Sequence, residues 1–254
     1  MFSQWRDLVW PREHGSWSFV LEPVALGLIA VPSVAGGGLA VAVVAAFFAR
    51  RPLGIAVRDP DADRRRAARV AFGVCAGMGL LGLSVAMAFA GVTWLPWLLP
   101  SVVAGAGFLA FDLRRAGRSG LAEISGVASF GLLPAAFAAV GGATPALSVA
   151  LAVVMCGRAV PTVLCVREAL RGAKSGVTHR LPALLAAFFA VAVAAALVAD
   201  GAAPWVAVAA LAVLALRALA LLVFPRPALR ARSIGMIEAM LGVAFVAAVG
   251  VAAN

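Results

Sequence analysis

The sequence has few charged residues and few cysteines for its length. Only 13% of its 254 residues are charged, against 64% that are hydrophobic, and it contains three cysteines, two histidines and no tyrosine. The cysteines, Cys75, Cys156 and Cys165, all fall inside apolar segments, so the chain has neither a disulfide framework nor a zinc-binding pattern. This composition predicts an integral membrane domain that comprises residues 1–254.

Apolar residues gather in segments that are long enough to cross a bilayer. About 20 such residues span the hydrocarbon core as a helix, and helices satisfy their own backbone hydrogen bonds there. We therefore predict an all-α, polytopic membrane protein with about nine transmembrane helices. The predicted spans are residues 17–35, 37–57, 67–91, 94–111, 121–141, 144–165, 181–199, 203–224 and 234–252.

Arginine and lysine fall on every second loop. The intervening loops, near residues 36, 92, 142 and 201, hold one charge, Asp200. By the positive-inside rule, the N-terminal segment 1–16 and the basic loops are cytoplasmic, and Asn254 lies outside. The basic loops carry Arg6 and Arg12, then Arg58, Arg64, Arg65, Arg66 and Arg69, then Arg114, Arg115 and Arg118, then Arg167, Arg171, Lys174 and Arg180, and finally Arg226, Arg230 and Arg232.

The formal charge of +10 is split among these short loops. We interpret it as a topological signal and as affinity for anionic lipid headgroups, and it argues against nucleic acid as a partner. The first 16 residues include Asp7 and Glu13 and do not form the pattern of a cleavable signal peptide.

Two short patterns occur twice. S-F-x-L-x-P spans 18–23 and 129–134, and P-x-x-x-x-V-R-acid spans 52–59 and 161–168. We interpret them as a duplication with halves 17–111 and 121–224, followed by a final helix at 234–252; coincidence is the alternative, because matches are frequent in an Ala- and Leu-rich chain. Repeats of four helices insert in the same direction, so the loops 58–69 and 167–180 are expected to face each other over one central cavity.

These two loops carry candidate site residues. Asp59, Asp61 and Asp63 offer oxygen ligands suited to Mg²⁺, and the neighbouring Arg58 could hold phosphate oxygens. The alternative is a solvated turn whose arginines anchor the topology. The second loop, with Arg167, Glu168, Arg171 and Lys174, could clamp an anion, or it is a basic interfacial loop.

Several charges fall inside the predicted spans, where an ionisable side chain is costly and is usually paired or functional. They lie within about two turns of the cytoplasmic helix ends, and we expect ion pairs between helices around a polar pocket. Snorkelling to the headgroups is the alternative, above all for Arg50 and Arg51. His14 is a titratable group at the membrane surface, or a satisfied polar residue. The other charges in the spans are Glu22, Glu123, Arg158, Arg217 and Glu238.

The N-terminal sequence P-R-E-H-G-S-W at 11–17, continuing to L-E-P-V-A-L-G at 21–27, closely resembles the signature of the YwiC-like family of bacterial membrane proteins. This resemblance implies a multi-pass protein of the bacterial inner (cytoplasmic) membrane.

The chain also resembles, more weakly, the UbiA superfamily of intramembrane prenyltransferases. It is carried by L-A-E at 121–123 with F-G-L-L-P at 130–134, and by Arg167-Glu168 with Lys174 and Gly176. It implies nine helices around a central cavity, with Mg²⁺ and a prenyl diphosphate held by the loops after the second and sixth spans. The chain departs from that pattern, because D-P-D-A-D at 59–63 lacks the usual asparagine and Leu170 and Gly172 replace expected acids.

This resemblance implies a UbiA-like enzyme that acts on a prenyl diphosphate with Mg²⁺, by prenyl transfer or terpene cyclisation. Phe47, Phe48 and Phe130 could stabilise a cation in the absence of tyrosine. The alternative is a non-enzymatic lipid- or isoprenoid-binding or carrier protein that kept the fold and lost the metal site. The expected catalytic residues are Asp59, Asp61, Asp63 and Glu168, with the three aspartates as Mg²⁺ ligands, and the expected substrate-binding residues are Arg58, Arg51, Arg167, Lys174, Arg171, His14, Glu22 and Glu123.

Overall fold

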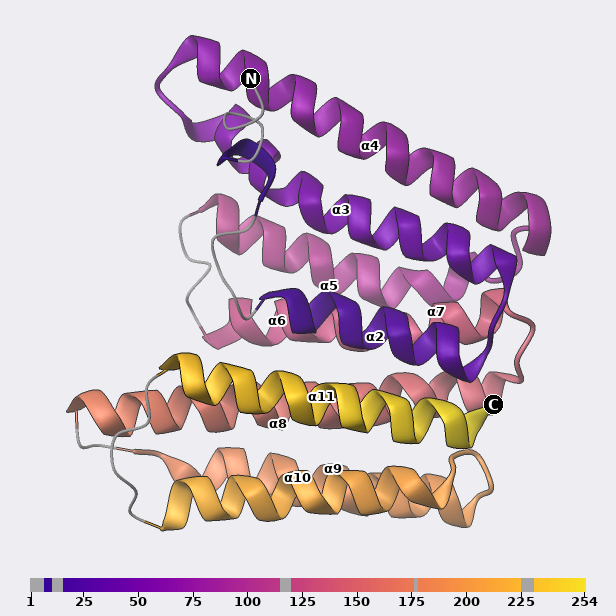
Figure 1. Ribbon diagram of the computed structural model, residues 1–254, viewed down its shortest axis with the longest axis vertical. Helices are drawn as coiled ribbons and strands as arrows, with labels where there is room; N and C mark the ends of the chain where they lie inside the picture. The colour runs from indigo at the N-terminus through magenta and orange to yellow at the C-terminus, as the bar shows by residue number, and fades with distance from the viewer. Residues whose placement is uncertain (1–6, 11–15, 115–119, 176–177, 225–230) are drawn as a thin grey trace.

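The computed structural model describes residues 7–10, 16–114, 120–175, 178–224 and 231–254, and throughout these ranges its regular structure is helical (Figure 1). The helices are α2 (Ser16–Ala30), α3 (Val34–Arg58), α4 (Ala62–Ala90), α5 (Leu95–Leu113), α6 (Gly120–Gly131), α7 (Leu133–Val140), α8 (Pro145–Ser175), α9 (Arg180–Ala199), α10 (Trp205–Val223) and α11 (Ala231–Ala253).

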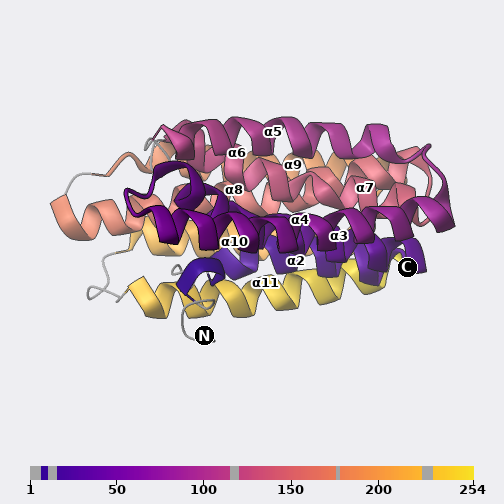
Figure 2. The same ribbon diagram turned by 90° about the horizontal axis from the view of Figure 1, so that it is seen from above.

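The helices run side by side in an elongated stack (Figures 1 and 2). The α3–α4 hairpin occupies one end of the long axis, and α9 with α10 occupies the other. Between them, α2 packs against both α7 and α11, and α8 packs against α6, α7, α9 and α10.

The helix lengths and surfaces are those of a membrane protein. Among the described residues, eight segments are long and apolar enough to cross a bilayer, counting α6 and α7 together as Gly120–Val140, and the apolar part of α2, Trp17–Ala30, is shorter. Large apolar side chains point outward on many helices, as at Leu80, Phe189 and Met240, where lipid tails would cover them. The prediction of a polytopic all-α membrane protein is confirmed.

Helix boundaries differ from the expected ones mainly at the basic loops. Helix α8 continues to Ser175 through residues expected to form a loop, because Arg, Glu, Ala and Leu favour helix and Glu168 pairs with Arg171 one turn later. Helix α4 begins at Ala62, so the arginine run belongs to its first turns.

Two helices in corresponding positions of the proposed halves are short or interrupted. Helix α2 contains Pro23 and ends at Ala30, two residues before Pro32. The fifth predicted span is broken at Leu132, since Pro134 in the first turn of α7 has no N–H to continue the α6 hydrogen-bond pattern.

Helix α2 joins the two main apolar cores. Val20 and Val24 pack in the core built with α3, α5 and α7, whereas Leu26 and Ala30 pack in the core built with α8, α10 and α11. The helix therefore contacts both halves of the chain along its length.

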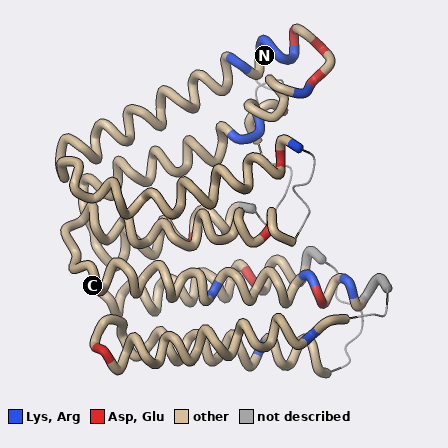
Figure 3. The backbone as a smooth tube through the Cα atoms, turned by 180° about the vertical axis from the view of Figure 1, so that it is seen from behind, with Lys and Arg blue, Asp and Glu red and all other residues tan. Residues whose placement is uncertain are grey.

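Nearly all described charges lie toward the same ends of the helices, which we call the charged end (Figure 3). Among the described residues, Asp200 is the only Asp, Glu, Lys or Arg at the opposite end. The predicted orientation, with the basic loops in the cytoplasm, depends on this segregation of charge. The orientation itself stays a prediction.

Candidate functional site: a buried ion network

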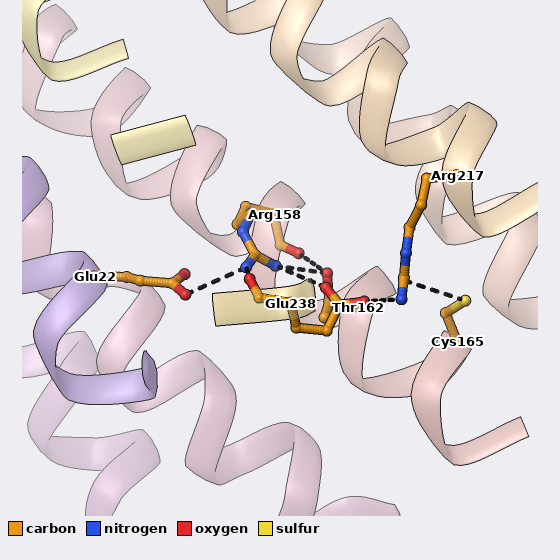
Figure 4. A network of polar contacts seen from close by, with 6 residues as sticks. All are labelled: Glu22, Arg158, Thr162, Cys165, Arg217 and Glu238. Atoms are coloured by element: carbon orange, nitrogen blue, oxygen red, sulfur yellow. Dashed lines mark hydrogen bonds and ion pairs between the residues drawn. The ribbon is translucent and has the colours of Figure 1, made fainter. Parts of the chain in front are cut away.

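Four charged side chains from four helices meet inside the stack: Glu22 of α2, Arg158 of α8, Arg217 of α10 and Glu238 of α11 (Figure 4). We call them the buried ion network. Nη2 of Arg158 lies 3.2 Å from Oε1 of Glu22, and Nη1 of Arg158 lies 3.9 Å from Oε2 of Glu238. Arg217 forms an ion pair with the other oxygen of Glu238. The expected ion pairs between helices are therefore present.

Three of the four side chains are almost completely enclosed, and the fourth, Arg217, is partly exposed. The exposed fraction is 3% for Arg158, 8% for Glu22 and 9% for Glu238, against 21% for the Arg217 side chain. Two carboxylates balance two guanidinium groups, which is the condition under which charges tolerate a low-dielectric interior. Glu22 lies about 9 Å along its helix from Ser16, so the network sits below the charged end and not at the membrane surface.

Arg158 is the centre of the network. It donates hydrogen bonds to Thr162 Oγ1 at 2.7 Å and to the carbonyl oxygen of Glu238 at 3.0 Å. The Thr162 hydroxyl in turn donates to the carbonyl oxygen of Arg158 at 2.8 Å. Within the described part of the chain, Nε of Arg158 has no hydrogen-bond partner. A buried guanidinium nitrogen without a partner is costly, and it leaves one donor available.

A glycine makes the central ion pair possible. A Cβ at Gly242, one turn after Glu238 on α11, would overlap Oε1 of Glu22 and lie 2.8 Å from Nη2 of Arg158. The backbone of α11 therefore occupies the space next to this pair, and any side chain at Gly242 would displace it.

A small cavity adjoins the network between α8, α9 and α10. Its volume is about 10 Å³, which is the room that one water molecule needs. Its polar lining consists of Arg158, Thr162, Cys165 and Arg217, and the rest is Gly, Pro, Ala and Leu. Arg217 also lies 3.9 Å from the Cys165 sulfur (Figure 4).

The structure gives two of the three aspartates of the first loop, Asp59 and Asp61, local side-chain partners. Asp61 is the N-cap of α4 and accepts from the N–H groups of Asp63 and Arg64. Asp59 accepts from the N–H of Asp61 at 3.1 Å and pairs with Arg64 at 3.1 Å. In the described residues, no group of three or more His, Cys, Asp or Glu side chains is placed to hold a metal ion.

The two repeat-related arginines do not face each other. Arg58 donates to the carbonyl oxygen of Asp112 at the end of α5, at 2.8 Å, and Arg167 pairs with Glu123 at the start of α6, at 2.7 Å. Because α5 and α6 pack together, they stand between the two arginines. Figure 1 places the α3–α4 turn and the end of α8 far apart along the long axis, so the expected convergence of the two loops is wrong.

The remaining expected site residues also have structural contacts. Glu168 is buried, pairs with Arg171 at 2.9 Å and accepts from the backbone N–H of His179, and so ties α8 to the start of α9. Arg51 donates to the carbonyl oxygen of Trp10. His14 and the side chain of Lys174 lie outside the described residues.

The sequence pattern indicates Glu22 as a site residue, whereas its partners Arg158, Arg217 and Glu238 stand out in the sequence only as charges within spans. The signal that could have added them to the site is the same for all three, an ionisable side chain in an apolar segment. Thr162 and Gly242 have no such signal, because their roles depend on which helix faces meet.

These observations define the class: a multi-pass α-helical membrane protein with a charge-balanced ion network buried between its helices. Within that class, the chain belongs to the YwiC-like family, since the family model described as YwiC-like protein matches residues 10–139, about half of the chain. The matched segment includes Glu22, whereas its partners lie beyond it. No curated protein and no solved structure matches the chain. The UbiA resemblance therefore has no support from known proteins or structures.

Proposed function

We propose that this YwiC-like protein is a non-enzymatic membrane carrier that works through rearrangement of the buried ion network. The observation that carries the proposal is the network itself, which links α2 of the first half to α8 and α10 of the second. Ionisable groups inside a membrane domain are rare and typically mark substrate, ion or proton pathways.

The placement of short and interrupted helices supports the same function. In secondary transporters, Pro-interrupted segments at corresponding positions of two repeats flank the substrate site. Here these segments are α2, with Pro23, and the α6–α7 pair, with its break at Leu132, and α2 packs against α7. Helix α2 carries Glu22 into the network.

The native Cys165 allows a direct test. It has 0% exposure and lies beside Arg217, so it reports on water access to the network. A carrier opens this region to each side of the membrane in turn. In a Cys75→Ala/Cys156→Ala background, we expect a membrane-impermeant thiol reagent to label Cys165 in both right-side-out and inside-out vesicles.

The matched control keeps Cys75 alone, with Cys156 and Cys165 replaced by Ala. Cys75 is buried on α4, away from the network, and should stay unlabelled from either side. Labelling of Cys165 from one side only, or from neither, would show that the network is static and would reject the carrier proposal.

The competing proposal is the Mg²⁺-dependent enzyme acting on a prenyl diphosphate, with Asp59, Asp61 and Asp63 as metal ligands. The capping role of Asp61 and the ion pair of Asp59 with Arg64 favour the carrier. The two differ in one assay, Mg²⁺-dependent release of diphosphate from C10, C15 or C20 prenyl diphosphates by purified protein. We expect no release; release that is lost in Asp59→Ala would favour the enzyme.

A further inference from the structure

We propose that the cavity beside Arg158 and Arg217 binds a small monovalent anion, and that a proton taken up by Glu238 accompanies it. This inference deepens the proposed carrier function, because it names a ligand class for the same network, and it can be tested by binding alone. The ligand is of the size of chloride or formate.

The chemistry of the cavity wall carries the inference. Its polar groups are two guanidinium groups, a hydroxyl and a thiol, and no carboxylate lines it. Arg158 is 3% exposed, and its Nε has no hydrogen-bond partner within the described residues. A wall that contains two guanidinium groups and no carboxylate is complementary to an anion, since charge-assisted hydrogen bonds to guanidinium are strong.

The volume of the cavity limits the size of the ligand. A cavity of about 10 Å³ admits one water molecule or an ion of similar size, and its apolar wall, which includes Ala187 of α9 and Leu211 of α10, leaves no further polar partners. A halide or formate fits with small side-chain shifts, whereas a sugar acid does not.

Charge balance then requires a proton. The titratable and charged groups that face the network are Glu22 from α2, Arg158 and Cys165 from α8, Arg217 from α10 and Glu238 from α11, and α9 contributes only Ala187 to the cavity wall. Their two carboxylates already neutralise the two guanidinium groups. An added anion would leave a net negative charge in a low-dielectric site unless one carboxylate takes up a proton.

Glu238 is the carboxylate that the anion would replace. It forms ion pairs with both Arg158 and Arg217, whereas Glu22 pairs with Arg158 alone among the described contacts. Protonated Glu238 would release both guanidinium groups toward the cavity. The bound state therefore holds one anion and one proton more than the free state, and its charge is unchanged.

The test uses purified full-length protein in detergent, with sodium chloride, sodium formate or sodium gluconate at equal ionic strength. We expect chloride or formate to raise Tm by about 5 °C at about 100 times its Kd, more strongly at pH 5.5 than at pH 7.5, and gluconate to have no such effect. In weak buffer, addition of the small anion should be accompanied by uptake of about one proton per anion bound, as linkage requires.

Three variants test the inference further. Arg217→Gln should abolish the Tm rise, whereas Arg69→Gln, an exposed arginine on α4, should keep it. Glu238→Gln imitates the protonated side chain, so it should raise anion affinity at pH 7.5 by about tenfold or more and abolish proton uptake. If Arg217→Gln does not fold, Glu238→Gln and the wild-type pH dependence still decide the question.

Equal effects of gluconate and chloride would overturn the inference, and the cavity would then be a water site. Anion binding without proton uptake would overturn the proposed coupling to Glu238. Labelling of Cys165 from both sides without anion binding would support the carrier proposal and reject the anion site. Anion binding with labelling from one side only would support the anion site and reject the carrier proposal.

Discussion

At the scale of single residues, Gly242 has the tightest surroundings in the buried ion network. Gly242→Ala should be destabilising by about 1–3 kcal/mol or more, because its Cβ would overlap the Glu22 carboxylate, and overpacking of a filled interior is costly. The measurement is thermal unfolding in detergent, together with the labelling of Cys165.

Gly235 on the same helix is the matched control. A Cβ there meets nothing within 4 Å. Gly235→Ala should leave stability unchanged or raise it by up to about 1 kcal/mol, because alanine favours helix. Equal effects of the two substitutions would mean that the close packing of α11 against Glu22 and Arg158 is not present in the protein.

Substitutions at Asp61 distinguish a helix-capping role of this side chain from a role in metal binding. Its side chain accepts from the N–H groups of Asp63 and Arg64 at the start of α4. Asp61→Ala should lower stability by about 1 kcal/mol, while Asp61→Asn, which also caps helices well, should change it little. A capping role further predicts that Mg²⁺ does not change the Tm of either variant or of the native protein. A Tm increase with Mg²⁺ that Asp61→Asn abolishes would instead identify a metal ligand.

At the scale of elements, α3 and α4 form a close hairpin through two glycines. A Cβ at Gly82 would lie 2.5 Å from the carbonyl oxygen of Gly38, and a Cβ at Gly38 would lie 2.7 Å from that of Gly82. Small residues let transmembrane helices approach closely, and α3 is the main packing partner of α4.

Gly82→Val should therefore separate the start of α3 from the end of α4 and increase limited proteolysis of this hairpin. Gly73→Val is the control on the same helix, since a Cβ at Gly73 meets nothing within 4 Å. Similar proteolysis of both variants would show that α4 is held by contacts other than this crossing.

At the scale of the whole molecule, the segregation of charge predicts the orientation. With nearly all described charges toward the charged end and Asp200 at the opposite one, a reporter fused after Asn254 should be active only outside the cytoplasm, and one fused after Arg118 only inside. The opposite pattern would reverse the orientation, and activity of both fusions on one side would contradict the number of crossings.

The sequence by itself determined the class, the helices and the family. Length and apolarity decide whether a segment can span a bilayer, and both are local properties, so the predicted spans agree with the helices apart from their ends, the short first helix and the break at Leu132. The signature at 11–27 likewise identified the YwiC-like family, whose model matches residues 10–139. Ion pairs inside the membrane were also predictable, because buried charge needs a partner there.

Only the tertiary structure decided which charges meet. Glu22 and Arg158 are 136 positions apart, and their contact depends on the faces that α2 and α8 present and on the absence of a side chain at Gly242. The same dependence explains why the two loops expected to converge do not. The sequence could relate Arg58 to Arg167 along the chain, but α5 and α6 pack between them, and the order of helices in a stack follows from the fit of their surfaces.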